Sequence, residues 1–212
     1  MDNIKLDFQK HIDAGRCNGA EWIINHKNNI YHEAIGYQDL DFSNKLDKGS
    51  YYRIWSMTKP IICFAAMQLI EKKFLSLNDA IDKYLPEFKN LTKLNTVTSK
   101  LSDISPVDYL PTIRQLLQHT AGFTYNSSNN YLAQEYENKG LFHSPNSSLE
   151  EEINNITRLP LLFEPGSNWH YSISIDILAR IIEVVTKDKI INILKENIFD
   201  PLEMNETNFF IS

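Results

Sequence analysis

A run of apolar residues from position 60 to 72 constrains the fold of this chain more than any other segment. It reads PIICFAAMQLIEK and leaves hardly any polar position between Ile61 and Ile70. A helix that lacks a polar face has to be covered by other elements, so the run predicts a buried helix. Pro60 is tolerated only in the first turn of such a helix, which therefore begins within a residue or two of Ser56.

Composition and charge exclude several classes of protein. The chain has 212 residues, which is enough to bury a sizeable core in one domain. Its net charge is −6 and it has no long basic run, so no nucleic-acid partner is expected. No apolar stretch reaches the roughly 20 residues that span a bilayer, so no membrane partner is expected. The N-terminus is charged and unlike a signal peptide. These features predict a soluble cytoplasmic protein whose oligomeric state the sequence leaves open.

The two cysteines and six histidines do not point to a metal or redox centre. Cys63 lies within the apolar run and is expected to be a small buried core residue, and no disulfide with Cys17 is expected in a reducing compartment. The histidines show no close ligand spacing, so neither a metal nor an organic cofactor is predicted.

Periodicity and turn residues predict the remaining elements. A helix is expected over residues 4–14 with a stop at Gly15, followed by a hairpin of two strands, Glu21–Asn25 and Ile30–Ile35. Further along, the patterns predict a loop or weak helix at 90–110 and a helix ending at Gly122. A long surface loop with at most one helical turn is expected at 125–148. It is followed by a helix capped by Ser148 with a solvated face of glutamates, and by helices at 175–186 and 191–204.

Ser56 and Lys59 have two interpretations. A bare S-x-x-K pattern is expected about once by chance in a chain of this size, and its residues are usually a helix cap and an exposed charge. Here, however, both side chains lie on one side of the first turn of an apolar helix. A lysine near the positive helix end and partly desolvated is expected to have a lowered pKa, so it could take the proton of the Ser56 hydroxyl. The backbone N–H of Ser56 could then stabilise an oxyanion.

Four ordered segments resemble the serine β-lactamase and penicillin-binding-protein superfamily, and more narrowly the class C β-lactamase-like esterases. YRIWSMTKPIICFAAMQLIEKKFLSLNDAIDKYLPEF resembles the S-x-x-K region. PTIRQLLQHTAGF resembles L-L-x-H-T-S-G, with Ala121 in place of serine. FEPGSNWHYSISIDILARIIEVVT is similar to the P-G-x-x-x-x-Y-S segment, and PLEMNETNFF to P-L-G-M-x-x-T-x-F.

The resemblance implies roles for three residues. Ser56 matches the acylated nucleophile, Lys59 the base that activates it, and Tyr171 the tyrosine that carries a proton to or from the leaving group. Taken without the resemblance, Tyr171 would be a half-buried aromatic residue in a turn. The other candidates are expected to be structural. His119 is expected to form a structural hydrogen bond. Trp55, Tyr125 and Trp169 are expected to pack in the core or at the rim and not to line a pocket.

The resemblance implies an α+β fold of the β-lactamase/transpeptidase type, in which helices flank an antiparallel sheet. Residues 1–212 are then the N-terminal portion of a β-lactamase-related domain, with the hairpin and buried helix in 1–89 and a mostly helical part in 90–212. The late K-T-G or H-x-G strand of the family is missing, and so are the strands that would complete the sheet. The sequence therefore predicts a chain that is inactive or unstable alone.

The implied activity is that of a serine hydrolase acting through an acyl-enzyme on a small-molecule ester or amide, without a cofactor. Lactamases of this type carry an asparagine two residues after the tyrosine. Ile173 stands there, which favours esters over β-lactams. The alternatives are a β-lactamase, a D-amino-acid peptidase, and a non-catalytic interaction module that kept the fold without the chemistry.

Overall fold

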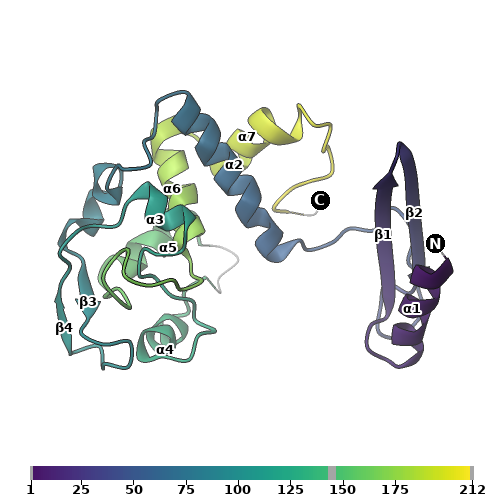
Figure 1. Ribbon diagram of the computed structural model, residues 1–212, viewed down its shortest axis with the longest axis horizontal. Helices are drawn as coiled ribbons and strands as arrows, with labels where there is room; N and C mark the ends of the chain where they lie inside the picture. The colour runs from purple at the N-terminus through teal and green to yellow at the C-terminus, as the bar shows by residue number, and fades with distance from the viewer. Residues whose placement is uncertain (1, 143–146, 211–212) are drawn as a thin grey trace. The chain divides into compact units, whose positions relative to one another are not determined.

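A computed structural model describes residues 2–142 and 147–210 (Figure 1). The chain divides into two compact units, Met1–Trp55 and Ser56–Ser212. The division of the domain at residues 89 and 90 that the sequence suggests stays a prediction. Within the described residues, none of the helices has both the length and the apolar character needed to cross a membrane.

The first unit is a helix packed on a hairpin. Helix α1 (Asp2–Asp13) is followed by the antiparallel strands β1 (Gly19–His26) and β2 (Asn29–Gly36). This arrangement confirms the predicted helix and the predicted hairpin.

Local conformation explains how the hairpin forms. Lys27 and Asn28 both have positive φ angles, 48° and 66°, which is the conformation of the two-residue turns that suit the twist of paired strands. Phe8 of α1 stacks on Trp22 of β1 with ring centroids 5.1 Å apart, so one aromatic pair joins the helix to the sheet.

The second unit is mostly helical. Its elements are α2 (Thr58–Glu71), β3 (Thr92–Leu94), β4 (Ile104–Pro106), α3 (Ile113–Leu117), α4 (Tyr131–Asn138), α5 (Leu149–Ile156), α6 (Ser174–Thr186) and α7 (Ile190–Leu194). Helix α6 lies at the centre, where it packs against α2, α3, α5 and α7 (Figure 1).

Helix α6 forms where the sequence predicts it because its apolar residues recur at helical spacing. Four of them, Ile177, Leu178, Ile181 and Ile182, are fully buried. Each such side chain contributes about 1.5–3 kcal/mol when it leaves water. The helix is therefore the scaffold on which the surrounding elements are placed.

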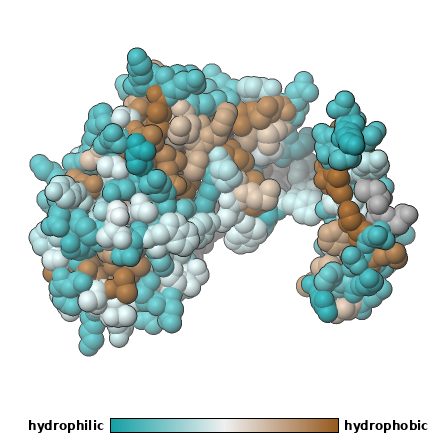
Figure 2. All heavy atoms as spheres, viewed as in Figure 1, coloured by the Kyte–Doolittle hydropathy of each residue, from teal (hydrophilic) through white to brown (hydrophobic). Residues whose placement is uncertain are grey.

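Helix α2 begins where the sequence predicts, but the prediction that it is buried on all sides is wrong for part of its surface. Ala65 and Ala66 face the core, whereas Phe64 and Met67 are 54% and 46% exposed. Figure 2 shows apolar side chains gathered over this part of the second unit. Cys63, predicted to be a buried core residue, is a half-buried free thiol. Apolar composition indicates that a helix face is to be buried, but it does not indicate which element packs against that face.

Three local predictions are wrong in detail. Residues 90–110 contain the antiparallel pair β3–β4 instead of a loop or weak helix. Helix α3 ends at Leu117 and not at Gly122, because His119 adopts a left-handed φ of 56° that no helix can continue. The predicted loop at 125–148 contains α4, capped by the Asn130 side chain, while its residues 143–146 lie outside the described part.

Helix α5 is capped as predicted. The Ser148 side chain accepts a hydrogen bond from the Glu151 N–H, and the Glu151 side chain accepts one from the Ser148 N–H in return. The prediction of a solvated glutamate face is wrong for Glu152. This residue is buried, and its carboxylate accepts a hydrogen bond of 2.8 Å from the Phe142 N–H.

Gly122 is expected to be indispensable for the loop that leads to Tyr125. Its φ is +92°, and an added Cβ would lie 2.6 Å from the backbone oxygen of Phe163. Gly122→Ala should therefore cost about 3 kcal/mol of unfolding free energy, through backbone strain and steric overlap together. Gly140→Ala is the matched control, since Gly140 also has positive φ but has no atom within 4 Å of such a Cβ. Urea unfolding followed by circular dichroism measures both, and equal losses would contradict the prediction.

Candidate active site

The local sequence brings Ser56 and Lys59 together at the start of α2. Ser56 lies in a 3-10 turn, Trp55–Met57, and the α-helix follows from Thr58. One turn later the Lys59 Nζ donates a hydrogen bond of 3.5 Å to the Ser56 Oγ. Ser56 is exposed and Lys59 is half-buried. The hydroxyl is thus open to a ligand while the amine behind it is partly shielded.

Two tyrosines from distant segments lie against the Lys59 amine. The Nζ is 5.1 Å from the centroid of the Tyr171 ring and 5.3 Å from that of Tyr125. The centroids of the two tyrosine rings are 5.6 Å apart. An ammonium at such distances is attracted by the ring faces. The structure therefore groups all three predicted residues, and it adds Tyr125, which the sequence assigned to core or rim packing.

The predicted lowering of the Lys59 pKa is wrong. Burial by itself lowers the pKa of Lys59, but hydrogen bonding to Tyr125, the negative charge of Asp176 and hydrogen bonding to Tyr171 together raise it above its usual range. These partners come from other segments, so the first turn of α2 could not reveal them. At neutral pH the amine is accordingly an ammonium, and it can lend positive charge to its neighbours.

Tyr125 differs from Tyr171 in how it is enclosed. Burial, followed by the nearby charge of Asp176, raises the pKa of Tyr125 above its ordinary value, although Lys59 opposes the rise. Tyr125 therefore keeps its proton at neutral pH. Tyr171 is 39% exposed, on the side open to solvent. Of the two tyrosines, Tyr171 is the more exposed.

Asp176 belongs to the same group, and sequence reasoning missed it. It lies in the first turn of α6, and its Oδ2 is buried without a hydrogen-bond partner among the described residues. Burial raises the pKa of Asp176 to about 6, while Lys59 pulls it down. The available signal was a carboxylate placed within SISIDILARII, a stretch that is otherwise mostly apolar.

His119 forms a hydrogen bond to the backbone, the kind of contact that the sequence predicts for it. Its Nδ1 accepts a hydrogen bond of 3.2 Å from the Ser172 N–H, and its ring lies 4.7 Å from the Tyr171 ring. Burial, followed by the charge of Lys59, lowers the pKa of His119. A ring that accepts at Nδ1 carries its proton on Nε2. This neutral imidazole fixes the backbone beside Tyr171.

The two remaining aromatic candidates are exposed. Trp169 is 67% exposed and lies at the rim, with its ring 6.5 Å from that of His119. Trp55 is 78% exposed, so core packing is not its role.

The group at the start of α2 has the parts that a nucleophilic hydroxyl needs. A serine hydroxyl, an ammonium and a reachable phenol adjoin one another, and a buried carboxylate lies behind them. Once the lysine–tyrosine pair has lost one proton, such a set can accept the proton of the serine and return it later. Over residues 2–142 and 147–210, no cluster of three or more His, Cys, Asp and Glu side chains could hold a metal ion.

Known proteins share this arrangement of sequence and fold. The sequence model of the Beta-lactamase family matches residues 5–212. Esterase EstB of Burkholderia gladioli is 28% identical over 95% of this chain and 50% of its own length. Lovastatin esterase of Penicillium rubens is 29% identical over 96% of this chain and 51% of its own. The structure of EstCE1, described as a hydrolase with promiscuous acyltransferase activity, matches with a TM-score of 0.78 at 29% identity, covering 95% of this chain and 51% of its own.

The chain spans about half the length of the curated relatives it matches. Over that half, the fold is the predicted α+β fold of the β-lactamase/transpeptidase type. The family match extends over nearly all of the residues and includes both the S-x-x-K turn and the segment with Tyr171. This chain belongs to the β-lactamase family, in the serine β-lactamase and penicillin-binding-protein superfamily with its esterase relatives.

Proposed function

We propose that the protein is a serine hydrolase that cleaves small esters through an acyl-enzyme on Ser56. The observation that carries this proposal is the Lys59 Nζ, which contacts the Ser56 Oγ at 3.5 Å and the Tyr171 ring at 5.1 Å. One cation thus touches both the nucleophile and the phenol that would move its proton. Two of the curated relatives are esterases, which supports the choice of esters.

In the first half-reaction the Ser56 Oγ attacks the ester carbonyl carbon. The reactive form of the Lys59–Tyr171 pair is the one that has lost one proton, and the hydroxyl proton of Ser56 fills that vacancy. The carbonyl oxygen becomes an oxyanion, and the Ser56 N–H at the start of the helix is one donor to it. When the carbon–oxygen bond breaks, the pair returns the proton to the leaving alcohol, and the acyl group stays on Ser56.

In the second half-reaction water attacks the acyl carbon. The same pair takes a proton from the water and returns one to the Ser56 Oγ as the carboxylic acid leaves. Tyr125 keeps its own proton, because burial and the charge of Asp176 raise its pKa. It therefore acts as a hydrogen-bond donor beside Lys59 and not as a second base.

Esters are favoured over β-lactams by the residue two positions after Tyr171. Ile173 is fully buried and offers no hydrogen bond to a substrate amide. A site that lacks a partner for an amide discriminates against substrates that need one. D-peptides and β-lactams are therefore expected to be poorer substrates than short-chain esters.

Labelling with a fluorophosphonate probe tests the proposal. In the purified protein, tryptic mass spectrometry should find the probe on Ser56 alone, and Ser56→Ala should remove it. Ser167→Ala is the matched control, since Ser167 is also exposed but its hydroxyl donates a hydrogen bond to the Glu164 backbone oxygen and not to a site residue. Parallel assays with a nitrophenyl acetate, a D-alanyl peptide and a cephalosporin rank the substrates. An unlabelled Ser56 in the folded protein would overturn the proposal and favour a non-catalytic interaction module.

A further inference from the structure

The carboxylate of Asp176 is unusual in α6, whose other charged side chains form ion pairs. Its Oδ2 is buried and has no hydrogen-bond partner among the described residues. Leaving a charged oxygen unpaired away from water is costly unless a compensating charge is close. The interactions of this carboxylate with other side chains involve Lys59 of α2 and Tyr125 of the loop after α3.

Asp176 does not pair with the basic residue of its own helix, which binds other carboxylates. Arg180 lies four residues after Asp176, the spacing at which an acid and a base commonly pair on a helix surface. Instead, the Arg180 guanidinium binds Glu150 at 2.6 Å and Glu183 at 3.2 Å. Asp176 is thus left with Lys59 as its cation. The other titratable groups nearby, Cys63 and His119, each interact with Lys59.

We propose that Asp176 is a positioning residue of the Ser56 site, whose carboxylate holds the Lys59 ammonium between the two phenols. The buried charge does this by attraction across the packed helices α2 and α6. Tyr125 lies beside both partners, so it keeps the carboxylate and the ammonium in one network. The inference deepens the proposed function, because it names the residue that fixes the protonation state of Lys59.

The alternative role of Asp176 is purely structural. An acid in the first turn of a helix is stabilised by the helix dipole whatever lies across from it. A helix-dipole role predicts that the loss of the charge lowers stability but leaves Lys59 unchanged. A positioning role predicts that the pKa of Lys59 falls, because the opposing negative charge is gone.

The test titrates the Lys59 side chain by NMR, through its ¹³Cε resonance assigned with Lys59→Arg. Asp176→Asn is expected to shift the Lys59 pKa downward. Glu196→Gln removes an equal charge from an exposed position and should leave that pKa in place. Should the asparagine variant not fold, Asp176→Ser removes the charge with less volume and serves in its place. An unchanged Lys59 pKa in a folded Asp176 variant would overturn the inference.

A second readout follows the rate of fluorophosphonate labelling against pH. In the wild-type protein this rate should rise across a pH of about 6, where Asp176 ionises. The Asp176→Asn variant should lack this rise, because the group that ionises there is gone, and should react about tenfold more slowly at pH 8, because the ammonium is no longer held in place. A rise near pH 6 that persists in the variant counts against the inference. The NMR titration needs no acyl transfer, so the role of Asp176 can be tested even if Ser56 proves unreactive.

Discussion

Replacing Lys59 with methionine is expected to slow the labelling of Ser56 by about 10³-fold, within the range typical of a lost general base. Methionine keeps the length and much of the apolar stem of lysine, so the fold should persist. What disappears is the cation that contacts the Ser56 Oγ at 3.5 Å and the Tyr171 ring at 5.1 Å. Without it, the Lys59–Tyr171 pair that takes the serine proton no longer exists.

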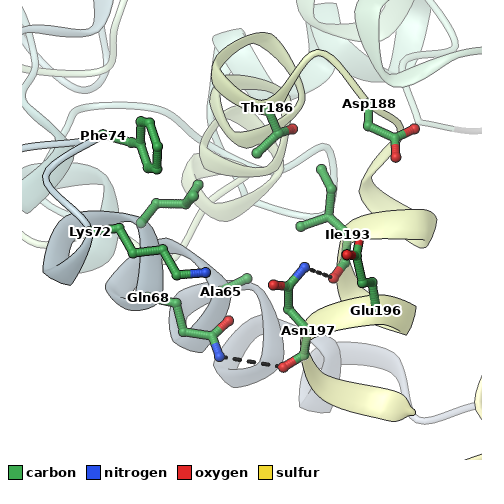
Figure 3. A pocket seen from close by; sticks show the side chains of 10 residues that line it. Ala65, Gln68, Lys72, Phe74, Thr186, Asp188, Ile193, Glu196 and Asn197 are labelled. Carbon is green, nitrogen blue, oxygen red and sulfur yellow. Dashed lines mark hydrogen bonds between the residues drawn. The ribbon is translucent and has the colours of Figure 1, made fainter. Parts of the chain in front are cut away.

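The matched control for this prediction is Lys72→Met, at the other end of the same helix. Lys72 lines a separate pocket of about 210 Å³ between the ends of α2, α6 and α7, together with Phe74 and Asp188 (Figure 3). Stopped-flow labelling of both variants, with circular dichroism to verify folding, measures the effect. A Lys59→Met protein that labels at the wild-type rate would show that the serine does not depend on this amine.

Replacing Phe88 with alanine is expected to destabilise the second unit by about 4 kcal/mol, as for other large-to-small changes in a closed core. Phe88 belongs to the 3-10 segment Pro86–Asn90 and is fully buried. Its ring meets that of Phe123 edge-on, with centroids 5.9 Å apart. Phe123 precedes Tyr125 by two residues, so this contact anchors the loop that carries Tyr125 to Lys59.

Urea unfolding followed by far-ultraviolet circular dichroism measures this loss through the helices of the second unit. Phe74→Ala is the control, because Phe74 is 61% exposed and its removal should cost less than about 1 kcal/mol. Similar midpoints for the two variants would mean that Phe88 does not support the core. A slower labelling of Ser56 in the Phe88→Ala protein, under conditions where it is folded, is expected because the Tyr125 loop loses its anchor.

The sequence by itself determined the features that depend on near neighbours. The 3.6-residue spacing of apolar side chains marked α6, and a polar Asn/Lys turn between β-rich runs marked the hairpin. Pro60 located the start of α2, and the spacing of Ser56 and Lys59 placed both on one turn. Ser148 and Glu151 formed the expected cap. In each case the interacting groups lie within a few residues, so the local pattern contains the whole interaction.

Only the tertiary structure decided the state of the site. Lys59 was expected to lose its proton readily, and it does not, because Tyr125, Asp176 and Tyr171 reach it from other segments. The sequence assigned Tyr125 to core or rim packing and gave Asp176 no role, because neither residue lies near Lys59 in the sequence. The pKa of a half-buried amine depends on which charges and dipoles surround it in space. Helical spacing and turn residues do not contain that information, which exists only once α2, α6 and the loop after α3 are packed together.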